Sequence, residues 1–227
     1  GRRLDAIVPV FVKHVGHTSA ESDEMNELRD NCFQGLESFV LRCPAEITPH
    51  LDSLVSVALQ FATYDPNYSY DEDEDDDMEE DDNFDGDDEY EDEYPDDDDE
   101  EDEDDDSSWK VRRAAVKLLT AIVSSRKEML SQLYETAAPA LVERFKEREE
   151  NVRVDVVEAV TALLKATPPG GNAMLDDLTP RLVEACAKQI VRDGYSKKKF
   201  EAKKAASSSD HPSSKNEKAK AACYALL

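Results

Sequence analysis

Residues 139–156 read PALVERFKEREENVRVDV, and this stretch decides the fold. Leu141 and Phe145 precede a charged segment, and Val152 and Val156 follow it, each pair at a spacing of four residues. That spacing places apolar side chains on one side of an α-helix. The stretch therefore predicts two amphipathic helices joined by the charged turn at residues 146–151.

The same spacing of three and four residues recurs almost everywhere outside residues 71–106. No segment alternates with period two for long enough to indicate a strand, so we expect an all-α chain. The apolar stripes before the acidic segment are Leu4, Ile7, Val8, Phe11, Val12 and Val15, then Leu28, Cys32, Leu36, Phe39 and Val40, then Leu51, Leu54, Val55, Ala58 and Leu59.

Prolines mark the first helix of each expected pair, at Pro9, Pro49, Pro139 and Pro180. The first two are 40 residues apart and the last two are 41 apart. A proline inside a helix removes a backbone hydrogen bond and costs about 3 kcal/mol. Its recurrence at a fixed place predicts a helix kink that the packing requires.

The second helix of three pairs begins with an apolar residue followed by arginine, and an acidic residue stands six positions before each arginine. These pairs are Asp23 with Arg29, Asp106 with Arg112, and Glu147 with Arg153. A two-helix period of 40 to 47 residues is typical of HEAT and armadillo arrays. We therefore predict a HEAT-repeat α-solenoid, a right-handed stack of antiparallel helix pairs. We expect the acids and arginines to form a ladder of charge-assisted hydrogen bonds between units, the alternative being solvated charges at helix ends.

Four repeat units are expected. Residues 1–43 form unit 1, residues 44–126 form unit 2 with a disordered acidic insertion at 65–108, and residues 127–167 form unit 3. Residues 168–227 form an incomplete unit 4, interrupted by a lysine-rich disordered insertion at 193–217. The chain lacks an initiating methionine and ends in an apolar run, so we expect a piece of a longer protein.

Residues 71–106 contain 29 acidic residues and no basic one, while the whole chain has a net charge of -27. A segment so charged cannot bury enough apolar surface to offset the entropy of ordering, which predicts disorder. It serves either as a solvated loop or as a polyanion that attracts a basic protein surface. The residues with a candidate role in partner binding are Asp96, Asp97, Asp98, Asp99 and Trp109.

Neither catalysis nor a cofactor is indicated, because the four histidines are scattered and no phosphate-binding loop or zinc-ligand spacing occurs. Residues 81–92 approach an EF-hand loop, but Asp92 replaces the bidentate glutamate, so we expect no metal site. Helical basic residues are balanced by acids, which argues against nucleic acid as a partner. No apolar run reaches the roughly 20 residues that cross a bilayer, which argues against a membrane.

Four stretches resemble the cullin-associated and neddylation-dissociated protein family, of the HEAT-repeat, TATA-binding-protein-interacting type. They are LRDNCFQGLESFVLRCP (28–44), TYDPNYSYDEDED (63–75), SSWKVRRAA (107–115) and PALVERFKEREENV (139–152). The resemblance runs from about residue 1 to residue 167 and points to an internal part of that family's N-terminal half. It fades over residues 170–220.

The resemblance implies a non-enzymatic scaffold of the cytoplasm and nucleus. Such proteins wrap a cullin and its RING-box partner, compete with cullin modification by a ubiquitin-like protein, and promote exchange of substrate-receptor modules. Two alternatives stay open. An importin-β-like transport receptor would use the acidic loop before Trp109 for a basic targeting segment and would release its cargo with Ran-GTP. An acidic histone chaperone would retain histone affinity in residues 65–108.

Overall fold

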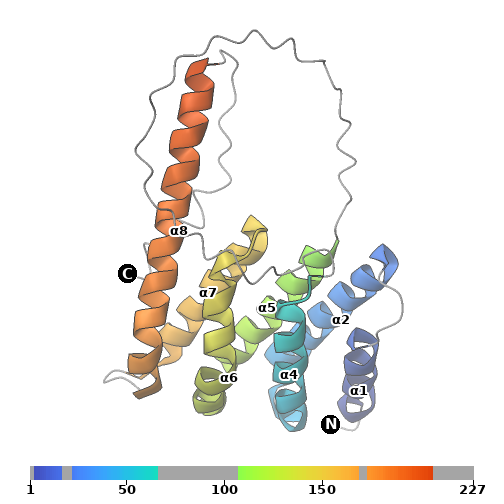
Figure 1. Cartoon of the computed structure of the whole chain (residues 1–227). Coiled ribbons are helices and arrows are strands. Elements are labelled where there is room, and N and C mark those ends of the chain that lie inside the picture. Colours follow the sequence, from blue (N-terminus) through green and yellow to red (C-terminus); the bar gives the residue numbers. More distant parts are fainter. Residues whose placement is uncertain (1–2, 17–21, 66–106, 169–172, 207–227) are drawn as a thin grey trace.

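A computed structural model describes residues 3–16, 22–65, 107–168 and 173–206, and within these ranges all regular elements are helices (Figure 1). The prediction of an all-α, HEAT-type stack is confirmed for this part of the chain. Residues 66–106, which include nearly all of the predicted acidic insertion, lie outside it.

The α-helices are α1 (Leu4–Val15), α2 (Asp23–Arg42), α3 (Pro44–Ile47), α4 (Leu51–Ala62), α5 (Ser108–Ser125), α6 (Leu130–Glu143), α7 (Glu150–Ala166) and α8 (Ala173–Ala206). Three short 3-10 helices join them, namely η1 (Thr48–His50), η2 (Lys127–Met129) and η3 (Arg144–Lys146).

The long helices form two layers (Figure 1). Helices α1, α4, α6 and α8 follow one another in the first layer, and α2, α5 and α7 form the second. Each helix of the second layer packs against its neighbours in that layer, α2 against α5 and α5 against α7. This arrangement of stacked pairs is the one expected of a solenoid, in which each unit contacts only adjacent units.

The core lies between the layers and along the contacts of α5. Eleven of the 18 residues of α5 are buried, among them Val111, Ala115, Leu118 and Ile122. Helix α5 packs against α2 on one side and α7 on the other, and Phe33, Leu36, Val156 and Val160 of those two helices are fully covered. Helix α5 is thus the central helix of the described stack.

Local sequence explains where the helices begin. The Ser22 hydroxyl accepts a hydrogen bond from the Met25 N–H and caps α2, whose first turn contains Asp23 and Glu24. Both features stabilise a helix N-terminus. Pro44 begins α3, where its missing N–H has no cost, and its carbonyl oxygen accepts a 2.6 Å hydrogen bond from Arg126 at the end of α5.

Gly35 permits the close contact of α1 with α2. A Cβ atom at this position would lie 2.6 Å from the Phe11 ring of α1. Glycine in the middle of a helix costs up to about 1 kcal/mol relative to alanine. Glycine is nevertheless required at position 35, because the Phe11 ring occupies the space that a side chain would need.

Two predicted features differ from the structure. Pro49 lies in the 3-10 turn η1 between α3 and α4, whereas Pro9, Pro139 and Pro180 lie inside α-helices. A proline has no N–H to donate, and the short 3-10 turn interrupts the helix there. In addition, two residues of the predicted apolar stripes, Ile7 and Leu28, are 38% and 41% exposed.

Helix α8 also extends beyond its predicted end. It runs to Ala206, through the first part of the range 193–217 that we expected to be disordered. That part contains lysine, alanine and glutamate, which are strong helix formers. Helix propensity therefore outweighs the absence of apolar periodicity at residues 193–206, and residues 207–217 lie outside the described part of the chain.

Candidate interaction surface

A buried polar cluster lies where α4 ends and α5 begins, on either side of residues 66–106. Arg112, whose side chain is fully buried, donates from Nη1 to the carbonyl oxygen of Tyr64 at 3.0 Å and to the hydroxyl of Ser108 at 2.8 Å. A single guanidinium nitrogen therefore joins the chain segments on the two sides of residues 66–106.

The same arginine reaches the next unit through Glu147. Arg112 Nε lies 3.3 Å from Glu147 Oε2, and Arg112 Nη2 donates to Glu147 Oε1 at 3.4 Å. Arg144 also pairs with this carboxylate, and the backbone N–H of Glu149 donates to it at 3.2 Å. Charge-assisted bonds of this kind are what a buried carboxylate requires. The cluster thus fixes unit 3 against unit 2.

Asp65 adds a second carboxylate. Its side chain is 5% exposed, lies 3.6 Å from Arg112 and accepts a 3.0 Å hydrogen bond from Arg148. We predicted Asp65 to be the first residue of the disordered insertion 65–108, but it is part of the folded stack, because two arginines hold it. The sequence pattern did not single it out, since it reads as the beginning of a loop.

Arg29 forms the corresponding contact one unit earlier. Its guanidinium donates to the Val15 carbonyl oxygen at 3.3 Å and to the Tyr64 hydroxyl at 2.9 Å. It also lies over the rings of Phe61 and Tyr64, 5.3 Å and 4.9 Å from their centroids. This arginine therefore links α2 to the end of α4 through aromatic and hydroxyl groups.

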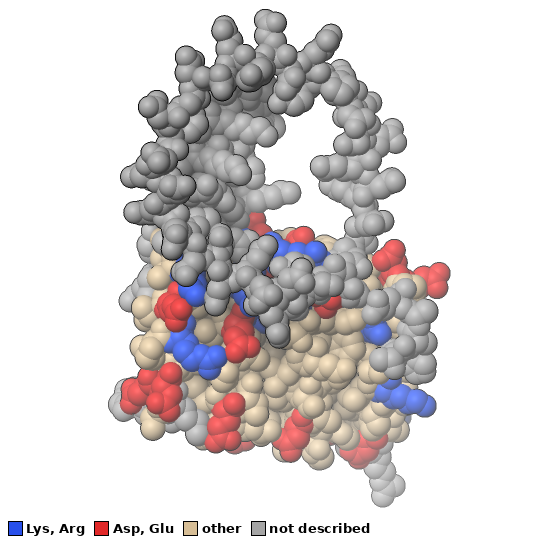
Figure 2. All heavy atoms as spheres, viewed as in Figure 1, with Lys and Arg blue, Asp and Glu red and all other residues tan. Residues whose placement is uncertain are grey.

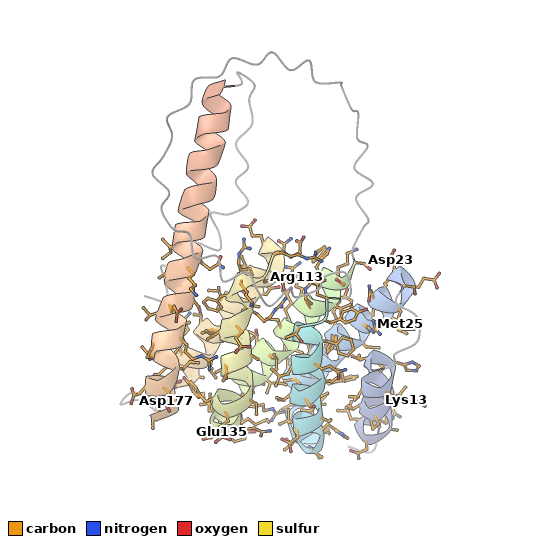
Figure 3. All side chains as sticks on the ribbon, in the orientation of Figure 1. Lys13, Asp23, Met25, Arg113, Glu135 and Asp177 are labelled. Atoms are coloured by element: carbon orange, nitrogen blue, oxygen red, sulfur yellow. The ribbon has the colours of Figure 1, made fainter. Side chains whose placement is uncertain are left out.

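Asp23, the acidic residue predicted to pair with Arg29, contacts a serine directly before α5. Asp23 accepts a 2.6 Å hydrogen bond from the Ser107 hydroxyl, which in turn accepts one from the Asn26 side-chain amide at 3.0 Å. Ser107 directly precedes α5, so Asp23 and Asn26 tie the chain leaving residues 66–106 to α2. Asp23 and Arg113 both lie toward the upper edge of the stack in Figure 3.

Of the predicted ladder residues, the side chains of Arg112 and Glu147 meet between successive units, and Asp23 accepts a hydrogen bond from Ser107. Glu147 meets Arg112 of the preceding unit with its side chain, and its backbone carbonyl accepts a 2.7 Å hydrogen bond from Arg153. Asp106 lies outside the described residues, as do Asp96, Asp97, Asp98 and Asp99. The sequence pattern did not indicate Tyr64, Asn26 or Ser107. Tyr64 and Ser107 flank the acidic run in the sequence, and Asn26 lies in α2.

Trp109 lies at a surface groove between α2 and α5. The groove has a volume of about 520 Å³ and is lined by Asp30, Gln34, Glu37, Ser38, Leu41 and Arg42 of α2, and by Trp109, Lys110, Arg113, Ala114 and Lys117 of α5. Trp109 is half-buried against the core, and Lys110 Nζ lies 5.8 Å from its ring centroid.

The opposite layer is less charged. Figure 2 shows the face formed by α1, α4 and α6, where the described charged side chains lie mainly around the margin. In the described part of the chain, no cluster of three or more histidine, cysteine or acidic side chains is arranged to hold a metal ion. None of the described helices is both long and apolar enough to span a bilayer.

Among the known proteins similar to this chain are cullin-associated NEDD8-dissociated proteins 1 and 2. Over 142 residues, 63% of the chain, it is 47% identical to "Cullin-associated NEDD8-dissociated protein 1" of Drosophila melanogaster. Identity to proteins of the same name is 45% over 80% of the chain in Arabidopsis thaliana, and 40% over 84% of the chain in Dictyostelium discoideum. The matches span 11%, 14% and 16% of those three proteins. No protein-family model matches the chain.

Proposed function

This chain is homologous to a segment of the cullin-associated NEDD8-dissociated proteins, and from that premise we propose that it is part of a scaffold that binds cullins. The scaffold would embrace a cullin and its RING-box partner and would regulate ligase assembly without catalysing a reaction. It would compete with attachment of the ubiquitin-like modifier and promote exchange of substrate receptors, in the cytoplasm and nucleus.

The observation that carries the proposal is the identity of 45% over 80% of the chain, because a match of this length covers most of the sequence. The fold is compatible with this function. Stacked helix pairs create a long surface that can follow a large partner. The polar cluster around Arg112 and Glu147 fixes the angle between units 2 and 3, and such a scaffold needs fixed angles to match a partner along its length.

Binding to an unmodified cullin tests the proposal. The full-length protein, immobilised, is incubated with a cullin bound to its RING-box protein, and in parallel with the same complex carrying NEDD8. We expect capture of the unmodified complex and weaker capture of the modified one. Equal capture of both would contradict the competition, and capture of neither would overturn the proposal.

A second variant tests whether the acidic run, residues 71–106, contributes to cullin binding. Residues 71–106 are replaced by a glycine-serine linker, and cullin capture is measured at low and high salt. If the run contacts a basic surface of the partner, the variant loses binding mainly at low salt, since exposed charges are screened within about 10 Å at 0.1 M salt. Unchanged capture would assign the run no role in cullin binding.

A further inference from the structure

The helices of the second layer differ in the sign of their charged side chains. Helix α5 contains no acidic residue, and Lys110, Arg113 and Lys117 follow one another on it at intervals of three and four. These three side chains form a basic stripe over two turns, about 10 Å long at 1.5 Å per residue. The neighbouring helices α2 and α7 instead carry acids, among them Asp30 and Glu158.

The basic stripe forms one wall of the groove between α2 and α5. Four basic and two acidic side chains line this groove, so it is locally positive in a chain whose net charge is -27. Arg113 is already engaged, with its Nε 2.7 Å from Asp155 of α7. Among the described residues, Lys110 and Lys117 contact no carboxylate within 4 Å. Their charges are therefore available to a ligand.

Apolar surface accompanies these charges. Leu41, 53% exposed, lines the groove on the α2 side, and half-buried Trp109 lines it on the α5 side. Ala114, which follows Arg113 in α5, also lines the groove. An exposed leucine and a half-buried tryptophan beside charged groups are typical of protein-binding surfaces, where aromatic anchors supply much of the affinity.

We propose that the groove between α2 and α5 binds an acidic amphipathic helix of a partner protein. Two of its carboxylates, seven residues apart on one face, would match the spacing of Lys110 and Lys117, and an apolar side chain would contact Trp109 and Leu41. The positive balance of the groove selects an acidic segment over a basic one. The inference goes beyond cullin binding, because it rests on the groove alone.

A synthetic peptide provides the probe. A fluorescein-labelled helical peptide of about five turns carries glutamates at three- and four-residue intervals and leucines beside them, and a control peptide carries glutamine in place of every glutamate. Anisotropy is measured with the full-length protein at low salt. We expect the acidic peptide to bind, and the glutamine peptide to bind at least about tenfold more weakly.

Variants then locate the site. Lys110→Glu with Lys117→Glu should weaken acidic-peptide binding by about tenfold or more. Lys127→Glu with Lys165→Glu, which makes the same change in net charge at exposed positions outside the groove, should change binding by less than about twofold. Equal losses in both double variants would show general attraction and overturn the proposal. Leu41→Ser should also weaken binding without altering the charge.

A third comparison separates a partner from the chain itself. Residues 66–106 are deleted in the full-length protein, with and without the Lys110→Glu and Lys117→Glu changes. If the acidic residues of the chain occupy the groove, deletion should raise peptide affinity about tenfold or more, and only when both lysines are present. That result would overturn the assignment to a partner. A change of less than about twofold supports it.

Discussion

The carbonyl oxygen of Tyr64 and the hydroxyl of Ser108 accept hydrogen bonds from the same nitrogen of Arg112, at 3.0 and 2.8 Å. The two acceptor atoms are therefore no farther apart than these two distances added together. Residues 66–106 leave and rejoin the helical stack at one place, which a buried arginine holds closed.

Replacing residues 66–106 by a short glycine-serine linker should preserve the fold. The ends of the segment are held by Arg112 and by Asp23, and neither contact involves the replaced residues. Shortening a chain connection of this length several-fold should raise the free energy of unfolding by about 1–2 kcal/mol. Thermal unfolding followed by circular dichroism measures the change, and a loss of helix per remaining residue would contradict it.

Arg112→Met should lower the free energy of unfolding by about 3–5 kcal/mol, because it removes one partner of a buried ion pair and frees the Tyr64 carbonyl. Arg113→Met provides the control. The Arg113 side chain is 38% exposed, and its pair with Asp155 should be worth no more than about 1 kcal/mol. Urea unfolding distinguishes the two, and similar midpoints would show that the buried cluster does not stabilise the stack.

The pairing itself is tested by combining Arg112→Met with Glu147→Gln. If the two side chains interact as the structure shows, the double variant should be less destabilised than the two single losses added together. The expected coupling is about 0.5–3 kcal/mol. Additive losses would mean that the two residues act independently. Arg144→Met measures how much of the Glu147 contribution depends on its other arginine.

Gly35→Val should destabilise the contact of α1 with α2 by about 1–3 kcal/mol, because the new side chain would overlap the Phe11 ring. Phe11→Ala, which removes that ring, should largely rescue the valine variant. The measurement is urea unfolding of the two single variants and the double variant. If Phe11→Ala gives no rescue, the destabilisation has another cause.

Burial raises the pKa of the Cys32 thiol. A raised pKa keeps the thiol protonated to higher pH, and the thiolate is the form that reacts. At pH 8, iodoacetamide should therefore modify the partly exposed Cys43 well before Cys32, and the rate at Cys32 should continue to rise above pH 9. Mass spectrometry of the labelled peptides follows both sites. Equal rates in the native state would contradict the buried position.

The sequence was sufficient for the fold because amphipathic spacing and the recurring arginines are properties of single helices. Arg112 and Glu147 were both singled out in this way. The sequence predicted contacts between units but not which acid meets which arginine, and the structure pairs Glu147 with Arg112 of the unit before it. Tyr64 and Ser107 gave no periodic signal, because they contribute through a backbone carbonyl and a hydroxyl at the ends of an acidic run.

Helix α5 has neighbours of its own layer on both sides, with α2 along one flank and α7 along the other. A defect in α5 would therefore loosen two helix contacts at once. Its backbone amides should accordingly exchange slowly with deuterated solvent.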